Sequence, residues 1–218
     1  MRSQRMYLLS MTFLCLLGFS GLAQANSLVF SDRTAFLSAS GAADITPTLT
    51  TFTGMGASLN IDGLTFSNPF GKTVFAGVWT PLLPGNDIAI NDNEDIDVTL
   101  PGDVFALGFD IHEPTGSAST FTATLFNGAT SVDSFTFDPP DDVAAFVGIW
   151  SDQTFNRLEV REATAINQDE YFGHFYAGNT PLQAVPEPNS LVLFGLGALG
   201  VLGYGQRRLK RMGSQSIA

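Results

Sequence analysis

Apolar and polar residues alternate along much of the segment between residues 27 and 178. In residues 120–126, for example, Phe121, Ala123 and Leu125 fall on one side of an extended chain, and threonines fall on the other. A period of two residues is typical of a β-strand with one buried face. The pattern predicts strands over residues 28–30, 48–52, 59–66, 73–79, 87–90, 96–100, 104–111, 120–126, 134–137, 145–150, 155–161 and 171–176.

Turn-forming sequences separate several of these predicted strands. They are Pro84-Gly85-Asn86, Pro101-Gly102-Asp103, Asn127-Gly128 and Asp138-Pro139-Pro140-Asp141. Many short strands joined by such turns favour an all-β fold, specifically an antiparallel β-sandwich of the jelly-roll type. One short helix is expected near the start of the domain, over residues 32–39, with Ser31 or Asp32 as its N-cap and with Phe36 and Leu37 against the sheet.

The first 25 residues contain the three parts of a secretory signal peptide in the required order. Arg2 and Arg5 precede an apolar run over residues 6–19, and the small residues Ala23 and Ala25 follow it. We therefore expect a signal helix over residues 1–25 that the export translocon recognises and that signal peptidase removes after Ala25. The alternative is an uncleaved membrane anchor, which the shortness of the apolar run disfavours.

The C-terminal end has three ordered parts of its own. A linker over residues 181–189 contains Val185-Pro186-Glu187-Pro188, in which the prolines oppose a helix. An apolar run over residues 190–206 is expected to be a transmembrane helix in the inner membrane. Residues 207–218 form a tail that should stay on the cytoplasmic side because it is basic. Its basic residues are Arg207, Arg208, Lys210 and Arg211.

The middle segment of the chain is strongly acidic. The formal net charge of the chain is -11, but residues 26–184 alone hold four basic residues against twenty carboxylates. So acidic a segment repels phosphate backbones, which argues against nucleic acid as a partner. The one cysteine, Cys15, lies in the predicted signal peptide, so the β-sandwich domain over residues 26–180 should be stabilised by its core and not by disulfides.

The C-terminal pattern resembles the PEP-CTERM protein-sorting signal of Gram-negative bacteria that make exopolysaccharide. The resemblance rests on Val185-Pro186-Glu187-Pro188, the glycine-rich apolar run and the basic pair Arg207-Arg208. It implies that an exosortase is a partner and cuts near Pro-Glu-Pro. It also implies transient anchoring in the inner membrane with the domain in the periplasm, followed by transfer to the cell surface or extracellular matrix. An ordinary C-terminal membrane anchor is the alternative.

The middle segment also resembles the β-sandwich domain of many proteins with this sorting tail. The matching residues are Gly63-Leu64-Thr65-Phe66, residues 106–111, Phe146-Val147-Gly148-Ile149 and the aromatic end over residues 172–178. These are core and turn residues, so the resemblance indicates the fold and not the function.

The densest acidic segment, residues 91–97, lies between two predicted strands and offers several oxygen ligands. Its carboxylates are Asp92, Glu94, Asp95 and Asp97. Calcium prefers such hard oxygen ligands, so calcium is the one cofactor that the sequence suggests. The spacing does not match the twelve-residue calcium loop, and a solvated acidic loop remains the alternative reading.

The sequence gives little support for catalysis. His112 and His174 are the only histidines, and none of the common hydrolase motifs is present. His174 is expected to be a structural partner within the last strand. Among the many carboxylates, Asp110 and Glu113 are candidates for a glycosidase pair, which keeps a secreted glycan-active hydrolase open as the alternative function.

Aromatic residues suggest a binding role instead. Trp79, Trp150, Tyr171 and Tyr176 are candidates for a platform that stacks on sugar rings, although such residues are more often core or cross-strand pairs. The favoured expectation is therefore a non-catalytic structural, adhesive or glycan-binding component of the exopolysaccharide matrix.

Overall fold

The computed structural model describes residues 26–90, 95–114, 119–163 and 170–183. The β-rich unit ends at Leu182. In chain order its elements are β1 (Ser27–Phe30), α2 (Arg33–Ser40), β2 (Ala43–Asp44), the 3₁₀-helix η1 (Pro47–Thr50), β3 (Gly54–Gly56), β4 (Ser58–Ile61), β5 (Leu64–Ser67), β6 (Val74–Gly77), β7 (Asp87–Ile90), β8 (Ile96–His112), β9 (Phe121–Asn127), β10 (Thr130–Phe137), β11 (Ala144–Glu162) and β12 (Tyr171–Gly178).

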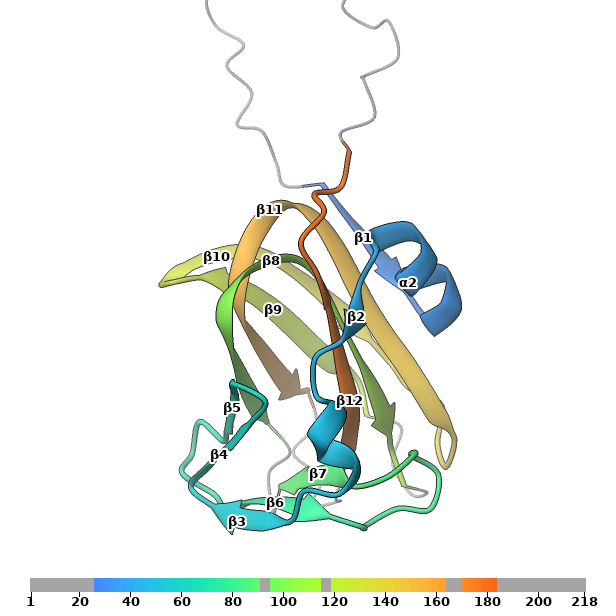
Figure 1. The fold of residues 1–218 in the computed structure, drawn as a ribbon, viewed down its shortest axis with the longest axis vertical. Coiled ribbons are helices and arrows are strands. Elements are labelled where there is room, and N and C mark those ends of the chain that lie inside the picture. Colours follow the sequence, from blue (N-terminus) through green and yellow to red (C-terminus); the bar gives the residue numbers. More distant parts are fainter. Residues whose placement is uncertain (1–25, 91–94, 115–118, 164–169, 184–218) are drawn as a thin grey trace, which may run out of the picture. The chain divides into compact units, whose positions relative to one another are not determined.

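The strands form one antiparallel sheet that folds into two layers, as Figure 1 shows. The first layer holds β3, β6, β7 and β12, then the second half of β8, the first half of β11, and β1. The second layer holds β4 and β5, then the first half of β8, the second half of β11, β9 and β10. The predicted antiparallel β-sandwich is therefore confirmed.

Two long bent strands join the layers. The pairs Thr99↔Arg157 and Val104↔Phe155 flank a bulge, in which residues 100–103 of β8 lie opposite Asn156 alone. A second register shift follows in β11 between Trp150 and Phe155. Bulges bend and twist the strands that contain them, so this stretch turns both β8 and β11 from one layer into the other.

The turn predicted at this bulge is absent. Pro101-Gly102-Asp103 was expected to be a turn between two strands, but it lies inside the continuous strand β8. A proline has no N–H for the ladder, and a bulge is a place where none is required. Likewise, the strands predicted over residues 145–150 and 155–161 are one strand, β11.

Two further predictions near the N-terminal half are wrong. Residues 48–52 were expected to be a strand, but Pro47–Thr50 is a 3₁₀-helix. Asp62, which lies outside this helix, accepts hydrogen bonds from the N–H and the hydroxyl of Thr48, at 2.9 and 2.8 Å. Residues 59–66 were expected to be one strand, but they form the hairpin β4–β5. Its two turn residues, Asp62 and Gly63, have φ angles of 52° and 90°, and positive φ at both positions is typical of a tight hairpin turn.

The core lies between the layers and is rich in phenylalanine. Phe66 of the second layer packs against Phe175 of the first with ring centroids 5.2 Å apart, and Phe109 packs against Phe137 at 6.0 Å. Phe66, Phe121 and Phe175 are fully buried. Each such ring stabilises the fold by roughly 1.5–3 kcal/mol relative to an exposed one.

Helix α2 covers the outer face of the first layer. It begins as predicted, because Asp32 caps it by accepting the N–H of Ala35 at 2.7 Å, and it ends at Gly41, whose φ of 67° is left-handed. Phe36, on its inner side, is fully buried in a small second cluster with Ala42, Ala106, Phe146 and Tyr176.

Within the four described ranges, no helix is long and apolar enough to cross a membrane. The predicted signal helix, with Ala23 and Ala25, lies outside the described residues, as do the Pro-Glu-Pro motif, the transmembrane helix over residues 190–206 and the basic tail.

Candidate functional site

Strand register assembles a row of side chains on the outer face of the first layer. Across β3, β6, β7, β12 and β8, the paired residues are Met55, Phe75, Ala89, Tyr171 and His112. Directly paired residues of neighbouring antiparallel strands point to the same face of a sheet. Because the flanking residues of β6, β7 and β8 enter the core, this row faces outward.

Trp79 adds a second aromatic ring at the β6 end of the row. Its ring packs edge-on against Phe75 with centroids 5.8 Å apart, and it lies over Gly77, where a Cβ would be 3.3 Å from the indole nitrogen. Trp79 is 50% exposed and the neighbouring Met55 is 70% exposed. We call Met55, Phe75 and Trp79 the Trp79 surface.

A buried carboxylate fixes the backbone beneath this tryptophan. Asp87 accepts the N–H groups of Trp79 and Thr80 through Oδ2, at 3.3 and 3.1 Å. Asp87 is fully buried, and this burial raises the pKa of its carboxyl group above the ordinary value, although the two backbone donors partly offset the effect. Asp87 therefore fixes the backbone that carries Trp79, while the ring itself packs against Phe75 and over Gly77.

At the other end of the row, Tyr171 and His112 stack. Their ring centroids are 5.7 Å apart and their planes differ by 14°. The His112 side chain is 6% exposed, and its Nε2 lies 3.7 Å from Oδ1 of Asp142, which is 61% exposed. Neither ring nitrogen of His112 has a hydrogen-bond partner.

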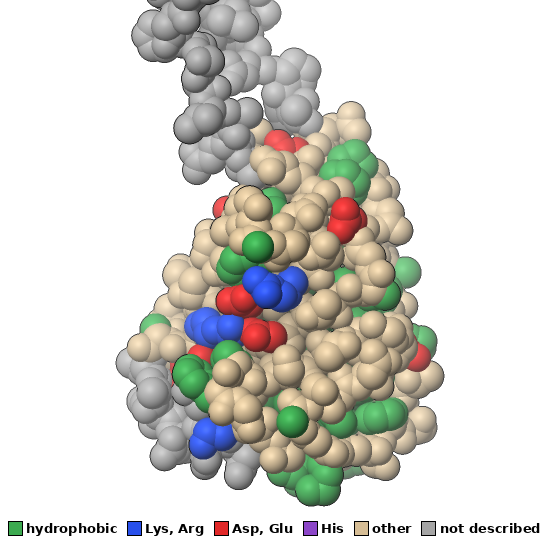
Figure 2. Space-filling view, turned by 90° about the vertical axis from the view of Figure 1, so that its left-hand side faces the viewer, with side chains coloured by type: hydrophobic (Ala, Val, Ile, Leu, Met, Phe, Trp, Pro, Cys, Tyr) green, Lys and Arg blue, Asp and Glu red, His purple; other side chains and the backbone are tan. Residues whose placement is uncertain are grey.

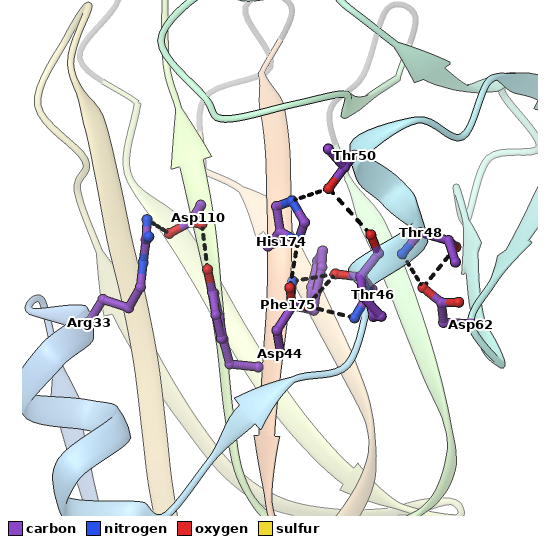
Figure 3. Close-up of polar contacts among 11 residues, drawn as sticks. Arg33, Asp44, Thr46, Thr48, Thr50, Asp62, Asp110, His174 and Phe175 are labelled. Atoms are coloured by element: carbon purple, nitrogen blue, oxygen red, sulfur yellow. Dashed lines mark hydrogen bonds and ion pairs between the residues drawn. The ribbon is translucent and has the colours of Figure 1, made fainter.

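A separate polar cluster lies beside helix α2 on the same face (Figure 3). Asp110 is fully buried; its Oδ1 accepts from Arg33 at 2.5 Å and its Oδ2 from the Tyr176 hydroxyl at 3.2 Å. Burial raises the pKa of Asp110, while the Arg33 charge acts against this. Burial and the Asp110 charge raise the pKa of Tyr176 to about 12, so its hydroxyl group stays protonated and can donate to Asp110 at neutral pH.

His174 holds the segment between β2 and η1 against β12. Its Nδ1 lies 2.9 Å from Asp44 Oδ2, and its Nε2 lies 3.4 Å from the Thr50 hydroxyl (Figure 3). One residue further along β12, the N–H of Phe175 donates to the Thr46 hydroxyl at 2.8 Å. These contacts make His174 a structural partner, as the sequence predicted.

The two carboxylates considered for a glycosidase pair are both inside the protein. Asp110 is held by Arg33 and Tyr176, and Glu113 is 0% exposed with its Oε1 accepting the N–H of Ser119 at 2.8 Å. Burial raises the pKa of the Glu113 carboxyl group. Neither group is presented to a polymer at the surface.

The four predicted sugar-contacting aromatic residues do not form one platform. Trp79 and Tyr171 belong to the row described above, but Trp150 lies near helix α2, where its indole N–H donates to the Thr180 carbonyl at 2.8 Å. Tyr176 is 8% exposed beneath the same helix. Trp150 and Gly178 both pair with Ala106, so Trp150 lies at the level of Gly178 along the strands. Gly178 is seven residues along β12 from Tyr171, so Trp150 and Tyr171 are roughly 20 Å apart.

Two of the four predicted calcium ligands, Asp92 and Glu94, lie outside the described residues. Asp97 pairs with Arg161 at 2.5 Å, while Asp95 is 3.8 Å from the same guanidinium and accepts the N–H of Glu162. Figure 2, which views the molecule from the left-hand side of Figure 1, shows basic side chains next to acidic ones. The residues that the structure describes contain no group of three or more acidic, histidine or cysteine side chains arranged to hold a metal ion.

Sequence reasoning missed Phe75, Met55 and His112 as neighbours of Trp79 and Tyr171. Each lies at an outward position of a strand, so alternation alone indicates its face. What no local pattern indicates is that β6, β7, β12 and β8 lie side by side in this order.

Comparison with known proteins identifies the C-terminal segment. Residues 184–208 match the family of PEP-CTERM protein-sorting motifs. The chain therefore carries the sorting signal that its sequence suggested, which marks it for export. A search of curated proteins found no match.

Among solved structures, the similarities are distant. An enzymatically active domain of tailspike protein 4 of bacteriophage CBA120 is 17% identical, with a TM-score of 0.34, and the match covers 59% of this chain but only 19% of that one. A variant of a family 29 carbohydrate-binding module is 13% identical over 76% of this chain and 99% of its own, with a TM-score of 0.35. A family 22 carbohydrate-binding module from Clostridium thermocellum is 12% identical over 54% and 87% respectively, with a TM-score of 0.35. TM-scores this low do not establish a shared fold.

Proposed function

We propose that this chain, which bears a PEP-CTERM sorting signal, is a non-catalytic component of the extracellular polysaccharide matrix that binds glycan through the Trp79 surface. The observation that carries the proposal is the half-exposed ring of Trp79, packed edge-on against Phe75 beside the exposed Met55. The export signal supports a destination in which polysaccharide is available to it.

The chemistry of this surface suits a sugar. The faces of pyranose rings carry C–H groups that pack on aromatic rings, while the rims carry hydroxyl groups. An indole offers a large flat apolar face together with an N–H donor. Because Asp87 holds the backbone at Trp79 and Thr80, little backbone freedom is lost there on binding, and such preorganisation favours affinity.

The sorting signal supports further partners. We propose that an exosortase processes the chain near Val185-Pro186-Glu187-Pro188 and that the translocon and signal peptidase act earlier, at the N-terminal segment. The domain would then pass from a transient inner-membrane anchor to the cell surface or matrix. The basic residues that follow the apolar run support the anchored intermediate.

A hydrolase has less support. Its candidate carboxylates, Asp110 and Glu113, are both fully buried and bonded to protein groups. No observation on the described residues favours this alternative over binding.

Affinity electrophoresis of the purified chain in native gels containing neutral polysaccharides tests the proposed function. Trp79→Ala should abolish the retardation that the unmodified chain shows. Leu28→Ala is the matched control, because Leu28 is 49% exposed on the outer face at the far end, beside Trp150. If Trp79→Ala and Leu28→Ala migrate like the unmodified chain in every gel, the proposal is wrong.

A further inference from the structure

We infer that the bound glycan is neutral and lies as an extended chain across strands β6, β7, β12 and β8, from Trp79 and Phe75 at one end to Tyr171 and His112 at the other. This inference rests on the proposed function and extends it from one ring to a row.

The register sets the length of this row. Phe75, Ala89, Tyr171 and His112 are successive cross-strand partners, so three strand spacings separate the first from the last. At about 4.8 Å for each spacing, the row is roughly 14 Å long, which is more than one sugar ring occupies. A ligand that uses the whole row must therefore be an oligomer.

The side chains of the row differ in a way that fits consecutive sugar units. Ala89, between the rings of Phe75 and Tyr171, contributes only a methyl group. The two aromatic groups at the ends of the row are thus separated by a small residue. A glycan chain running along the row would stack on the Trp79 surface with one unit and on Tyr171 with another.

The β8 end supplies polar groups. His112 is nearly buried, stacked on Tyr171, and neither of its ring nitrogens has a hydrogen-bond partner. Buried polar groups in native proteins are rarely left without a partner, so an unpartnered imidazole next to an aromatic ring indicates a ligand group. Sugar hydroxyls donate and accept, and the exposed carboxylate of Asp142 lies close enough to His112 to take part.

Charge selects the class of glycan. The exposed carboxylate of Asp142 lies beside His112 at one end of the row, and residues 26–184 carry twenty carboxylates against four basic residues. A polymer of uronic acids would be repelled by this surface, whereas a neutral glycan would not.

Isothermal titration of the purified chain with neutral β-linked gluco- and manno-oligosaccharides, from disaccharide to hexasaccharide, tests the inference. The affinity of the unmodified chain should rise with ligand length and then level off once the row is filled. Tyr171→Ala should leave the affinity for disaccharides unchanged and reduce the affinity for hexasaccharides about tenfold, which corresponds to about 1.4 kcal/mol. Trp79→Ala should weaken ligands of every length.

Two further variants distinguish a loss of binding at the row from a loss caused by misfolding. Tyr171→Phe keeps the ring and should retain the dependence on length, and Leu28→Ala should behave like the unmodified chain. If Trp79→Ala loses binding while Tyr171→Ala binds hexasaccharides normally, the proposed function stands and the row is wrong. If no neutral oligosaccharide binds, or if uronic-acid oligomers bind more tightly, both the neutral glycan and the row are wrong.

Discussion

Gly108 and Gly148 lie directly opposite each other on β8 and β11, and together they form a slot that Phe36 of helix α2 fills. A Cβ at Gly148 would lie 2.8 Å from Phe36 Cδ2, and one at Gly108 would lie 2.5 Å from Phe146 Cζ and 3.0 Å from Phe36 Cε1. Helix α2 therefore reaches the sheet only because both positions lack a side chain.

Gly148→Ala should destabilise the domain by about 1–3 kcal/mol, because an added methyl group overpacks a site that is already filled. Urea unfolding followed by tryptophan fluorescence measures the change. Gly102→Ala is the matched control, because a Cβ there meets nothing within 4 Å, and its stability should stay near that of the unmodified chain. Equal stability of the two variants would show that α2 does not depend on the slot.

Arg33→Ala should destabilise the domain at pH 7 by about 1–3 kcal/mol, because it leaves the buried acceptor Asp110 without its charged donor. The loss should be smaller near pH 4. Burial raises the pKa of Asp110, so its carboxyl group then becomes protonated and needs no cation. Unfolding curves at the two pH values measure the difference, and Asp110→Asn in the Arg33→Ala background should restore part of the stability. A loss of the same size at both pH values would contradict the ion-pair role.

The buried carboxyl groups predict how stability depends on pH. Burial raises the pKa values of Asp87, Asp95, Asp110 and Glu113, so the folded state holds their protons more tightly than the unfolded state does. Their stabilising contribution is present below the unfolded pKa, near 4, and is lost as the pH rises through the raised pKa values.

Asp87→Asn isolates one part of this dependence. Its amide oxygen can still accept the N–H groups of Trp79 and Thr80, but the side chain no longer ionises. The stability difference between pH 4 and pH 7 should therefore be smaller in this variant than in the unmodified chain. Asp32→Asn, which changes an exposed helix cap that can still accept a hydrogen bond, serves as the control. If the stability difference between pH 4 and pH 7 is unchanged in Asp87→Asn, Asp87 does not contribute to the pH dependence of stability.

Removal of the signal peptide should add an ion pair to the domain. The backbone nitrogen of Asn26 lies 3.2 Å from Oδ1 of Asp152, and its side-chain nitrogen lies 3.2 Å from Oδ2. Cleavage after Ala25, as the sequence predicts, turns this backbone N–H into an ammonium group. An exposed pair of this kind contributes about 0.2–1 kcal/mol.

A domain that begins with a free amine at Asn26 should therefore melt slightly higher than the same domain with an acetylated amine. Asp152→Asn should remove the difference, and differential scanning calorimetry at low salt measures it. If acetylation lowers the melting temperature equally in both, Asp152 is not the partner of the amine.

Calcium binding by residues 91–97 stays a prediction. An ion bound there would compete with Arg161 for Asp97. Millimolar calcium should raise the melting temperature of the chain, and Asp92→Ala should abolish the shift while magnesium produces less of it. A melting temperature that does not respond to calcium would leave the solvated acidic loop as the correct reading.

Local patterns determined the elements whose stabilising contacts lie near them in the chain. Alternation over residues 120–126 gave β9, and the cap at Asp32 gave the start of α2, since both depend on adjacent side chains and solvent exposure. The same rules failed where distant partners decide. Residues 96–100 and 104–111 are one strand because residues 100–103 of β8 form a bulge opposite Asn156 of β11. Residues 48–52 do not join the sheet, and the N–H of Thr48 donates to Asp62 instead.

The sequence by itself determined that this chain is an acidic β-sandwich with a sorting signal, because these properties follow from composition and from the order of neighbouring residues. Only the tertiary structure decided that Trp79, Phe75, Tyr171 and His112 share one row and that Trp150 does not. Their meeting depends on which strands pair and in which register, and pairing energy is gained between segments that lie far apart in the chain.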